Sequence, residues 1–415
     1  YLDQGGAPSI AYGIGVDRSG AVLVFNDPGV TTWHCFPLGT VIGGCTPFIV
    51  GTVQPDTLVG HDGAVHTVSR CFEREYDGDL VEIHIAGTLP LRVTPEHQIL
   101  VARPYRTRSG KKIQLGVRPW FPALKRFKPV PEWVEACSIS EGDYVLSPTF
   151  LSNMAPQDIA ESTDPRTAPM DLRASPETAW LIGLYAGDGY DHSGGGVGFV
   201  LSDVETESRA IAALRSLGSS PRVIERTDTY ARIMASSVIL SRSFRAWCGA
   251  TAPTKRLPEF VFNGEWDLGL VLDGLIAADG YTSKDGARIL DSTSITLAYQ
   301  AWHIAVTLGC RPTITGPHIP GPSGYANGKP TYRVRIARDG ARWSRGQRVG
   351  EYYAMPVLSI SHPSYAGPVF NFEVSDANSY IANGVAVHNC DGGFNSYTYG
   401  IAFQGGHASG RAGSL

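Results

Sequence analysis

The chain has 415 residues, of which 43% are hydrophobic and 18% charged, enough to bury the cores of about two or three domains. Its 48 glycines and 28 prolines follow no period, which excludes a collagen-like or disordered chain. The net charge of −4 gives no global argument for nucleic acid binding. No apolar run reaches the roughly 18 residues of a membrane span, and the first residues do not resemble a signal peptide. The odd number of cysteines, seven, does not indicate a disulfide framework, so we expect a reducing, cytoplasmic location.

Both ends of the sequence are predicted to be rich in β-strands. Residues 46–101 and 356–388 contain short runs of β-branched and aromatic residues that are separated by turn-forming pairs. The pairs expected to form turns are Asp62-Gly63, Asp77-Gly78, Gly367-Pro368 and Asn383-Gly384.

A basic segment follows the first β-rich region. The chain has no Asp or Glu between Gln98 and Pro131, which suits either a solvated surface or one that follows a phosphate backbone. The side chains considered as DNA contacts are Arg103, Arg106, Arg108, Lys111, Lys112, Lys125, Arg126 and Lys128.

The middle of the chain contains an internal duplication. LIGLYAGDGY (181–190) aligns with LDGLIAADGY (272–281) at an offset of 91 residues, and the same offset aligns SLGSSPRV (216–223) with TLGCRPTI (307–314). Two matches at one offset predict a pseudo-two-fold pair of α/β repeats.

Each repeat contains a helix that ends in an acidic residue. Ser175 and Pro176 predict the start of the first helix, and Asn263 is the expected start of the second. Small residues four apart allow the two helices to pack closely, which would bring Asp188 and Asp279 together at their C-terminal ends. Two carboxylates at negative helix ends favour a hard divalent cation.

The duplicated motif resembles the LAGLIDADG homing endonucleases. The resemblance implies that Asp188 and Asp279 bind Mg²⁺ and that Lys255, in Lys-Arg-Leu-Pro, supports an endonuclease site. It further implies a monomer with internal two-fold symmetry that binds and cuts double-stranded DNA.

The C-terminal β-rich region ends in His388, Asn389 and Cys390. An Asn side chain can attack its own carbonyl, a His can polarise that carbonyl, and a Cys can accept an acyl group. Upstream, the chain also has CFPLGT beginning at Cys35, and Thr94 and His97 lie three residues apart in TPEH.

These blocks together resemble inteins, the Hint-fold protein-splicing elements. The resemblance implies that Thr94 and His97 activate the His34–Cys35 bond and that Cys35, Cys390 and Asn389 then act in turn to excise residues 35–389 without a cofactor. Cys45 is an alternative first residue. Two departures from the family pattern are Asn371 in place of an Asp and Asn378 in place of a His, which would alter the coupling of steps.

The resemblance implies a mixed fold, with an all-β, horseshoe-like splicing domain split by the α/β endonuclease. The flanks resemble a fragment of the N-acetylmuramoyl-L-alanine amidase and peptidoglycan-recognition family, so the host would be a bacterial or phage protein. The expected DNA target is the host gene without the insertion, and the flanks act in cis. The expected divisions are residues 1–34 and 390–415 for the flanks, 35–150 and 351–389 for the splicing domain, and 151–350 for the endonuclease.

Two alternatives remain open at this point. The chain could be a splicing-only intein whose insert binds DNA without cutting it, or a Hedgehog-like autoprocessing domain. The second needs no C-terminal Asn and Cys, so the sequence VAVHNC argues against it.

Overall fold

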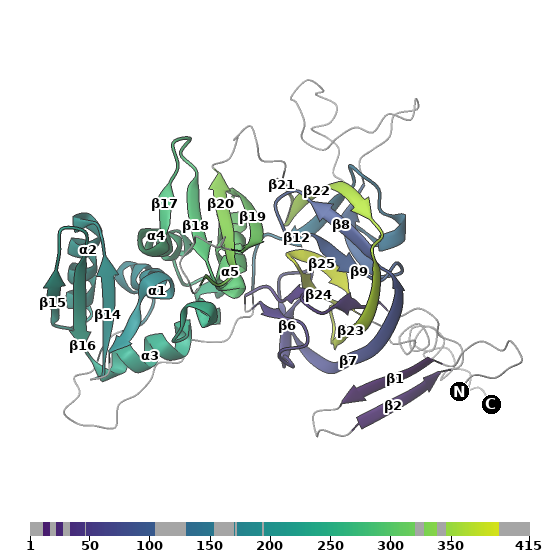
Figure 1. The fold of residues 1–415 in the computed structure, drawn as a ribbon, viewed down its shortest axis with the longest axis horizontal. Helices are drawn as coiled ribbons and strands as arrows, with labels where there is room; N and C mark the ends of the chain where they lie inside the picture. Colours follow the sequence, from purple (N-terminus) through teal and green to yellow (C-terminus); the bar gives the residue numbers. More distant parts are fainter. Residues whose placement is uncertain are drawn as a thin grey trace, which may run out of the picture.

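The structure is a computed structural model and contains a β-rich part joined to a part with helices and two small sheets (Figure 1). Within the described residues, no helix is both long and apolar enough to cross a lipid bilayer. The described residues are 34–45, 47–103, 130–152, 170, 172–192, 195–319, 328–337 and 346–389, with the backbone of 11–16 and 22–27.

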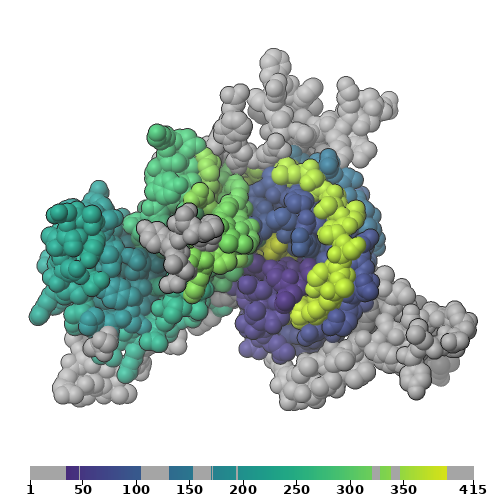
Figure 2. All heavy atoms as spheres, in the orientation of Figure 1, coloured from purple at the N-terminus to yellow at the C-terminus, as the bar shows by residue number. Residues whose placement is uncertain are grey.

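The β-rich part contains two antiparallel sheets. In the first sheet the long strands β7 and β23 pair along most of their length and curve around the second sheet (Figure 2). The six-stranded sheet has the order β2 (Val22–Asp27), β1 (Ala11–Val16), β7 (Val65–Asp79), β23 (Ser364–Val374) and β3 (Phe36–Pro37), with β6 (Thr57–Val59) also on β7. The 11-stranded sheet has the order β5 (Phe48–Ile49), β4 (Val41–Ile42), β24 (Ser379–Ala382), β25 (Val385–His388), β10 (Gln98–Ala102), β12 (Tyr144–Pro148), β22 (Tyr352–Ser361), β8 (Val81–Ile85) and β9 (Leu91–Val93), with β11 (Glu132–Glu135) on β10 and β21 (Gln347–Val349) on β22.

Two of the four expected turns are confirmed and two are wrong. Asp62-Gly63 lies between β6 and β7, and Asn383-Gly384 joins β24 to β25 with φ values of 45° and 75°. Asp77-Gly78 and Gly367-Pro368 instead lie inside β7 and β23, where they pair across the ladder. The long pairing of these two strands outweighs the local turn preference of each pair.

The middle of the chain forms two structural units with the same strand order. The first unit has the sheet β13 (Tyr190–His192), β14 (Gly196–Leu201), β16 (Ala231–Ser236) and β15 (Pro221–Arg226), with helices α1 (Pro176–Asp188), α2 (Val204–Ser216) and α3 (Val238–Cys248). The second has β17 (Gly280–Thr282), β18 (Arg288–Ser292), β20 (Thr331–Ala337) and β19 (Arg311–His318), with α4 (Leu268–Asp279) and α5 (Ile295–Thr307). Short 3₁₀ turns cover Ala136–Ser138, Ala252–Thr254 and Glu259–Phe262.

Helices α1 and α4 pack against each other between the two small sheets (Figure 1). The Ser175 hydroxyl caps α1 by accepting from the Thr178 N–H, as expected, whereas α4 begins five residues later than expected, with Asp267 as its cap. The helix backbones are so close that a Cβ on Gly183 would lie 2.0 Å from the Val271 carbonyl oxygen. Glycine at this contact is therefore a steric requirement.

The α5 helix joins the second unit to the β-rich part. Its Trp302 indole N–H donates to the Gly87 carbonyl at 2.7 Å, and its Thr296 hydroxyl donates to the Pro47 carbonyl at 2.6 Å. Buried residues of both parts belong to one continuous hydrophobic cluster. The two parts therefore share a core.

The expected fold class, an all-β splicing domain split by an α/β domain, is contradicted by this arrangement. The described residues are mostly β, in four separate antiparallel sheets with five α-helices. The strands of the middle units close into small antiparallel sheets of their own, and the core runs without interruption from them into the β-rich part through α5.

A buried histidine in α5 makes the stability depend on pH. Burial lowers the pKa of His303 from 6.5 to about 4. Between these pH values the unfolded chain binds more protons than the folded chain, so the free energy of unfolding falls as the pH falls. We expect a loss of about 3 kcal/mol over this window, and His303→Leu should remove most of it in urea unfolding at pH 7 and pH 4.5. If the free energy of unfolding of His303→Leu fell between pH 7 and pH 4.5 as much as that of the wild type, His303 would not be the source of the pH dependence.

Candidate functional sites

The first candidate site surrounds the peptide bond between His34 and Cys35. Cys35 precedes β3 and is 1% exposed. Its backbone N–H donates to the Thr94 hydroxyl at 3.1 Å, and the Thr94 N–H donates to the Cys35 carbonyl at 3.0 Å. The Thr94 side chain therefore contacts the nitrogen of the bond that the sequence analysis singled out.

His97 is brought to the same place by a tight turn. Its N–H donates to the Thr94 carbonyl at 3.0 Å, which explains the spacing of three residues between them. The His97 ring is buried, lies edge-on to the Phe36 ring at 4.3 Å between centroids, and is 5.7 Å from the His34 ring. Burial, helped by His34 and His388, holds the pKa of His97 well below 6.5, so the ring is neutral at pH 7.

The C-terminal end of β25 lies in the same neighbourhood. Strand β25 pairs with β10, which follows directly on His97. The His388 Nδ1 lies 3.0 Å from the Asn389 carbonyl oxygen, within range to donate to it. The Asn389 amide nitrogen donates to the Val374 carbonyl at 3.1 Å. The structure thus brings Cys35, Thr94, His97, His388 and Asn389 to one region, while Cys390 lies outside the described residues.

Two further side chains approach His388, and the sequence analysis missed both. The Trp133 ring, on β11, lies edge-on to the His388 ring at 5.1 Å and to the His61 ring at 5.5 Å. The His61 Nδ1 is 2.7 Å from the Ser379 hydroxyl, and Ser379 pairs with His388 across β24 and β25. No motif links residues so far apart in the sequence.

The second candidate site is the pair of acidic residues at the ends of α1 and α4. Burial, followed by the charge of Asp279, raises the pKa of Asp188 to about 6, and burial raises the pKa of Asp279 as well. A Cβ on Gly187, next to Asp188, would lie 3.5 Å from the Asp279 backbone nitrogen, so the two helices end close together. Carboxylates that repel each other in this way are suited to sharing a cation.

Lys255 lies at the C-terminal end of α1. Its buried ammonium donates to the carbonyl oxygens of Tyr185 and Gly189, each at 2.6 Å, and lies 4.0 Å from the centre of the Tyr185 ring. Within the described residues, it makes no ion pair within 4 Å with Asp188 or Asp279. Lys255 therefore caps the C-terminal end of α1 and acts on the carboxylates only from a distance.

The described residues contain no group of three His, Cys, Asp or Glu side chains that could hold a metal ion by itself. A cation at Asp188 and Asp279 would need further oxygen ligands from water or from a bound phosphate. Mg²⁺ commonly binds in this way, through one or two carboxylates, waters and substrate phosphates. The acidic pair fits a cation that is shared with a phosphate-bearing partner.

Of the eight expected DNA contacts, only Arg103 lies within the described residues. Its guanidinium donates to the Ser138 carbonyl at 3.2 Å and lies 3.4 Å from a Glu132 carboxylate oxygen. Arg103 is therefore held by its own domain. The others, Arg106, Arg108, Lys111, Lys112, Lys125, Arg126 and Lys128, lie outside the described residues.

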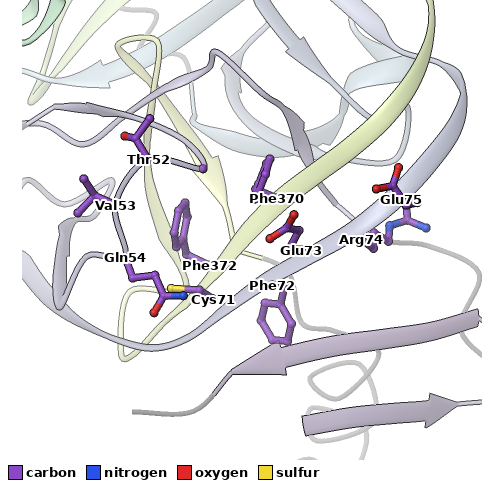
Figure 3. Close-up of a pocket in the computed structure, with 11 residues that line it drawn as sticks. Thr52, Val53, Gln54, Cys71, Phe72, Glu73, Arg74, Glu75, Phe370 and Phe372 are labelled. Carbon is purple, nitrogen blue, oxygen red and sulfur yellow. The ribbon is translucent and has the colours of Figure 1, made fainter. Parts of the chain in front are cut away.

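A cavity of about 420 Å³ lies against the long strands β7 and β23. Figure 3 shows Cys71, Phe370 and Phe372 beside it, whereas the Phe72 ring points to the other side of β7. Phe72 packs with Cys35 on that other side. Burial raises the pKa of the Cys71 thiol to about 11, so the thiol in this cavity is a poor nucleophile.

No family model matches the chain. It is 26% identical to the iron-sulfur cluster assembly SufBD family protein Rv1461 of Mycobacterium tuberculosis, over 86% of this chain and 43% of that protein. It is 25% identical to the ATP-dependent DNA helicase Hel308 of Thermococcus kodakarensis, over 82% of this chain and 34% of the helicase. The chain thus spans less than half the length of these relatives.

Similar solved structures include I-DmoI in complex with DNA and Mn, at 18% identity and a TM-score of 0.28, over 39% of this chain and 89% of I-DmoI. Full-length DUF199/WhiA from Thermatoga maritima is 17% identical with a TM-score of 0.28, over 41% of this chain and 54% of that one. Scores this low do not establish a shared fold.

These findings contradict the expected identity. The relatives carry the names of iron-sulfur cluster assembly proteins and a DNA helicase, and no relative named here is called an intein, a Hint protein or an amidase. The expected self-splicing function, the expected homing endonuclease activity and the enzyme class built on them are corrected on the same grounds.

Proposed function

We propose that the site around Cys35 activates the peptide bond between His34 and Cys35 for attack by the Cys35 thiol. The observation that carries the proposal is the hydrogen bond from the Cys35 N–H to the Thr94 hydroxyl, beside the neutral, buried ring of His97. The proposal concerns this bond alone. It includes neither the release of an internal segment nor the joining of flanking segments.

The step is a rearrangement in which no atoms are lost. The Cys35 sulfur bonds to the His34 carbonyl carbon, the carbon–nitrogen bond breaks, and the thiol proton moves to the freed nitrogen. The His97 ring lies beside this bond, 5.7 Å from the His34 ring, and its lowered pKa makes its protonated form a strong proton donor, which suits it to pass the proton to the leaving amine. Thr94 holds that nitrogen in place, and no cofactor is needed. The reducing cytoplasm of a bacterial or phage-infected cell would keep the thiol free.

We propose a role for His388 and Asn389 at the peptide bond that follows Asn389. His388 donates to the Asn389 carbonyl and makes its carbon more electrophilic. The role of Cys390 and the expected divisions of the chain remain predictions.

The test uses the full chain with an added small thiol, 2-mercaptoethanesulfonate. A thioester at Cys35 would exchange with it and release a fragment that ends at His34 and carries the added thiol, which mass spectrometry identifies. Cys35→Ala should abolish this product. Cys45→Ala is the matched control, because Cys45 is also buried and was the alternative nucleophile, and it should form the product. An equal yield from wild type and Cys35→Ala would overturn the proposal.

We propose a second function for the two repeated units, the binding of double-stranded DNA with a divalent cation at Asp188 and Asp279. The acidic pair with raised pKa values favours it. Arg232 on β16 and Arg333 on β20 occupy corresponding strands of the two sheets, and their side chains are 43% and 50% exposed. Their present partners are the carboxylates of Glu225 and Asp291, which phosphates could replace. Cutting of the DNA is not part of this proposal.

The second test measures fluorescence anisotropy of a labelled duplex with and without Mg²⁺. We expect Mg²⁺ to tighten binding by about tenfold, and the double variant Asp188→Asn with Asp279→Asn to lose this dependence while keeping the salt dependence of phosphate contacts. Asp228→Asn, at an exposed position, is the control. A DNA affinity that depends neither on Mg²⁺ nor on the salt concentration would contradict the proposal.

Iron-sulfur cluster assembly, the process in the names of three relatives, is not proposed for this chain. Those relatives share 43% of their length with it, and the described residues provide no set of three ligands.

A further inference from the structure

The Asn371 side chain contacts the other half of the peptide bond that Thr94 holds. Asn371 lies in β23 and is completely buried. Its amide nitrogen donates to the His34 carbonyl oxygen. The N–H and the carbonyl of the His34–Cys35 bond are therefore each held by a buried side chain, from Thr94 and from Asn371.

The orientation of the Asn371 amide is fixed by its neighbours. Its oxygen accepts from the Phe372 N–H at 2.5 Å and from the Tyr380 hydroxyl. Two donors at the oxygen leave the NH₂ group to face the His34 carbonyl, since a flipped amide would place donors against donors. Tyr380 is itself completely buried, so this orientation is held by packed groups.

We infer that Asn371 is a catalytic residue that stabilises the negative charge on the His34 carbonyl oxygen as the Cys35 thiol attacks. The inference rests on the proposed function of the Cys35 site. A fixed amide N–H in a buried site stabilises such an oxyanion more than water does, because it needs no reorientation and the local dielectric is low. Tyr380 is the positioning residue, because its hydroxyl donates to the Asn371 amide oxygen and so holds the amide in this orientation.

The contact with the His34 carbonyl favours an amide over a carboxylate at position 371. A carboxylate at 371 would place negative charge against the oxygen that becomes negative, whereas a neutral amide donates to it. Asn371 is therefore suited to polarise the bond, although it cannot relay a proton.

The test compares the rate of thiol-dependent release at His34 in wild type, Asn371→Asp, Asn371→Leu and Tyr380→Phe. We expect Asn371→Leu to be about 100-fold slower at every pH, as for loss of one oxyanion donor. Asn371→Asp should be equally slow at pH 8 but recover relative to wild type as the pH falls, because a protonated carboxyl can donate. Tyr380→Phe should show a smaller loss, of about threefold to tenfold.

The outcomes separate the two proposals. Rates for Asn371→Leu and Asn371→Asp within threefold of wild type, with Cys35→Ala inactive, would overturn the role of Asn371 and leave the proposed function standing. Equal release from wild type and Cys35→Ala would overturn the proposed function itself. A variant that fails to fold is recognised by its circular dichroism, and the pH-dependent recovery of Asn371→Asp then decides, because a purely structural role predicts no recovery.

Discussion

Replacing Gly274 with alanine is expected to lower the free energy of unfolding by about 3 kcal/mol. A Cβ at this position would lie 2.0 Å from the Trp180 carbonyl oxygen and 2.8 Å from the Leu184 nitrogen, so α1 and α4 would have to separate. In an exposed helix the same substitution stabilises by up to about 1 kcal/mol, because alanine is the better helix former. A fall in the free energy of unfolding, in place of the rise expected for an exposed helix, would therefore show that α1 and α4 are in close contact at Gly274.

Gly269→Ala is the matched control, because Gly269 lies in the same helix. A Cβ there would approach only the side-chain oxygen of Asp267, at 3.0 Å, which caps the helix and needs to shift by only a few tenths of an ångström, so the cost offsets at most part of the gain in helix propensity. This variant should be neutral or slightly more stable in urea unfolding. If Gly274→Ala proved as stable as Gly269→Ala, the close approach of the two helices would be wrong, and with it the juxtaposition of Asp188 and Asp279.

The helix pair could be predicted from the sequence because its signals are local. Ser175 caps α1 directly, and the small residues of the duplicated motif lie on the face that packs. The start of α4 was misplaced because Asn263 and Asp267 are both capable caps, but Asn263 ends the 3₁₀ turn Glu259–Phe262, whereas the Asp267 side chain accepts from the Leu270 N–H. Local sequence signals therefore predict that the second helix exists but not at which residue it begins.

The strands were predicted less well where pairing is long-range. Asp77-Gly78 carries the strongest short turn signal, yet it continues β7 because β23, nearly 300 residues later, pairs with it. The pairing of β7 with β23 and the packing of the core determine that Asp77-Gly78 continues the strand instead of forming a turn. Neither can be recognised in a short window of sequence.

The Cys35 site shows the same limit. Thr94 and His97 lie three residues apart in the sequence, and one tight turn places both near the His34–Cys35 bond. Asn371 looked like the loss of a functional group, and its role becomes visible only when β23 brings its amide to the His34 carbonyl. His61 and Trp133 have no pattern that joins them to His388. Residues that reach a site from strands far apart in the sequence can be assigned to it only once the fold is known.

Replacing Gln300 with leucine is expected to lower the free energy of unfolding by roughly 3–5 kcal/mol. Gln300 is completely buried in α5. Its amide oxygen accepts from the Leu257 N–H at 2.6 Å, and its amide nitrogen donates to the carbonyl oxygens of Leu257, at 2.7 Å, and Cys45. Leucine would leave these backbone groups buried without this partner, which costs more than the loss of a solvent-exposed hydrogen bond.

The substitution also tests how the two parts of the chain are joined, because Leu257 belongs to the repeated units and Cys45 to the β-rich part. Thr296→Val is the control on the same helix, since it removes one hydrogen bond, to Pro47, that is less buried, and should cost about 1 kcal/mol. Hydrogen exchange should show faster opening of both the segment around Cys45 and the segment around Leu257 in Gln300→Leu. Faster exchange at Leu257 alone would show that the β-rich part is stable without this bridge and that the shared core, rather than Gln300, holds the parts together.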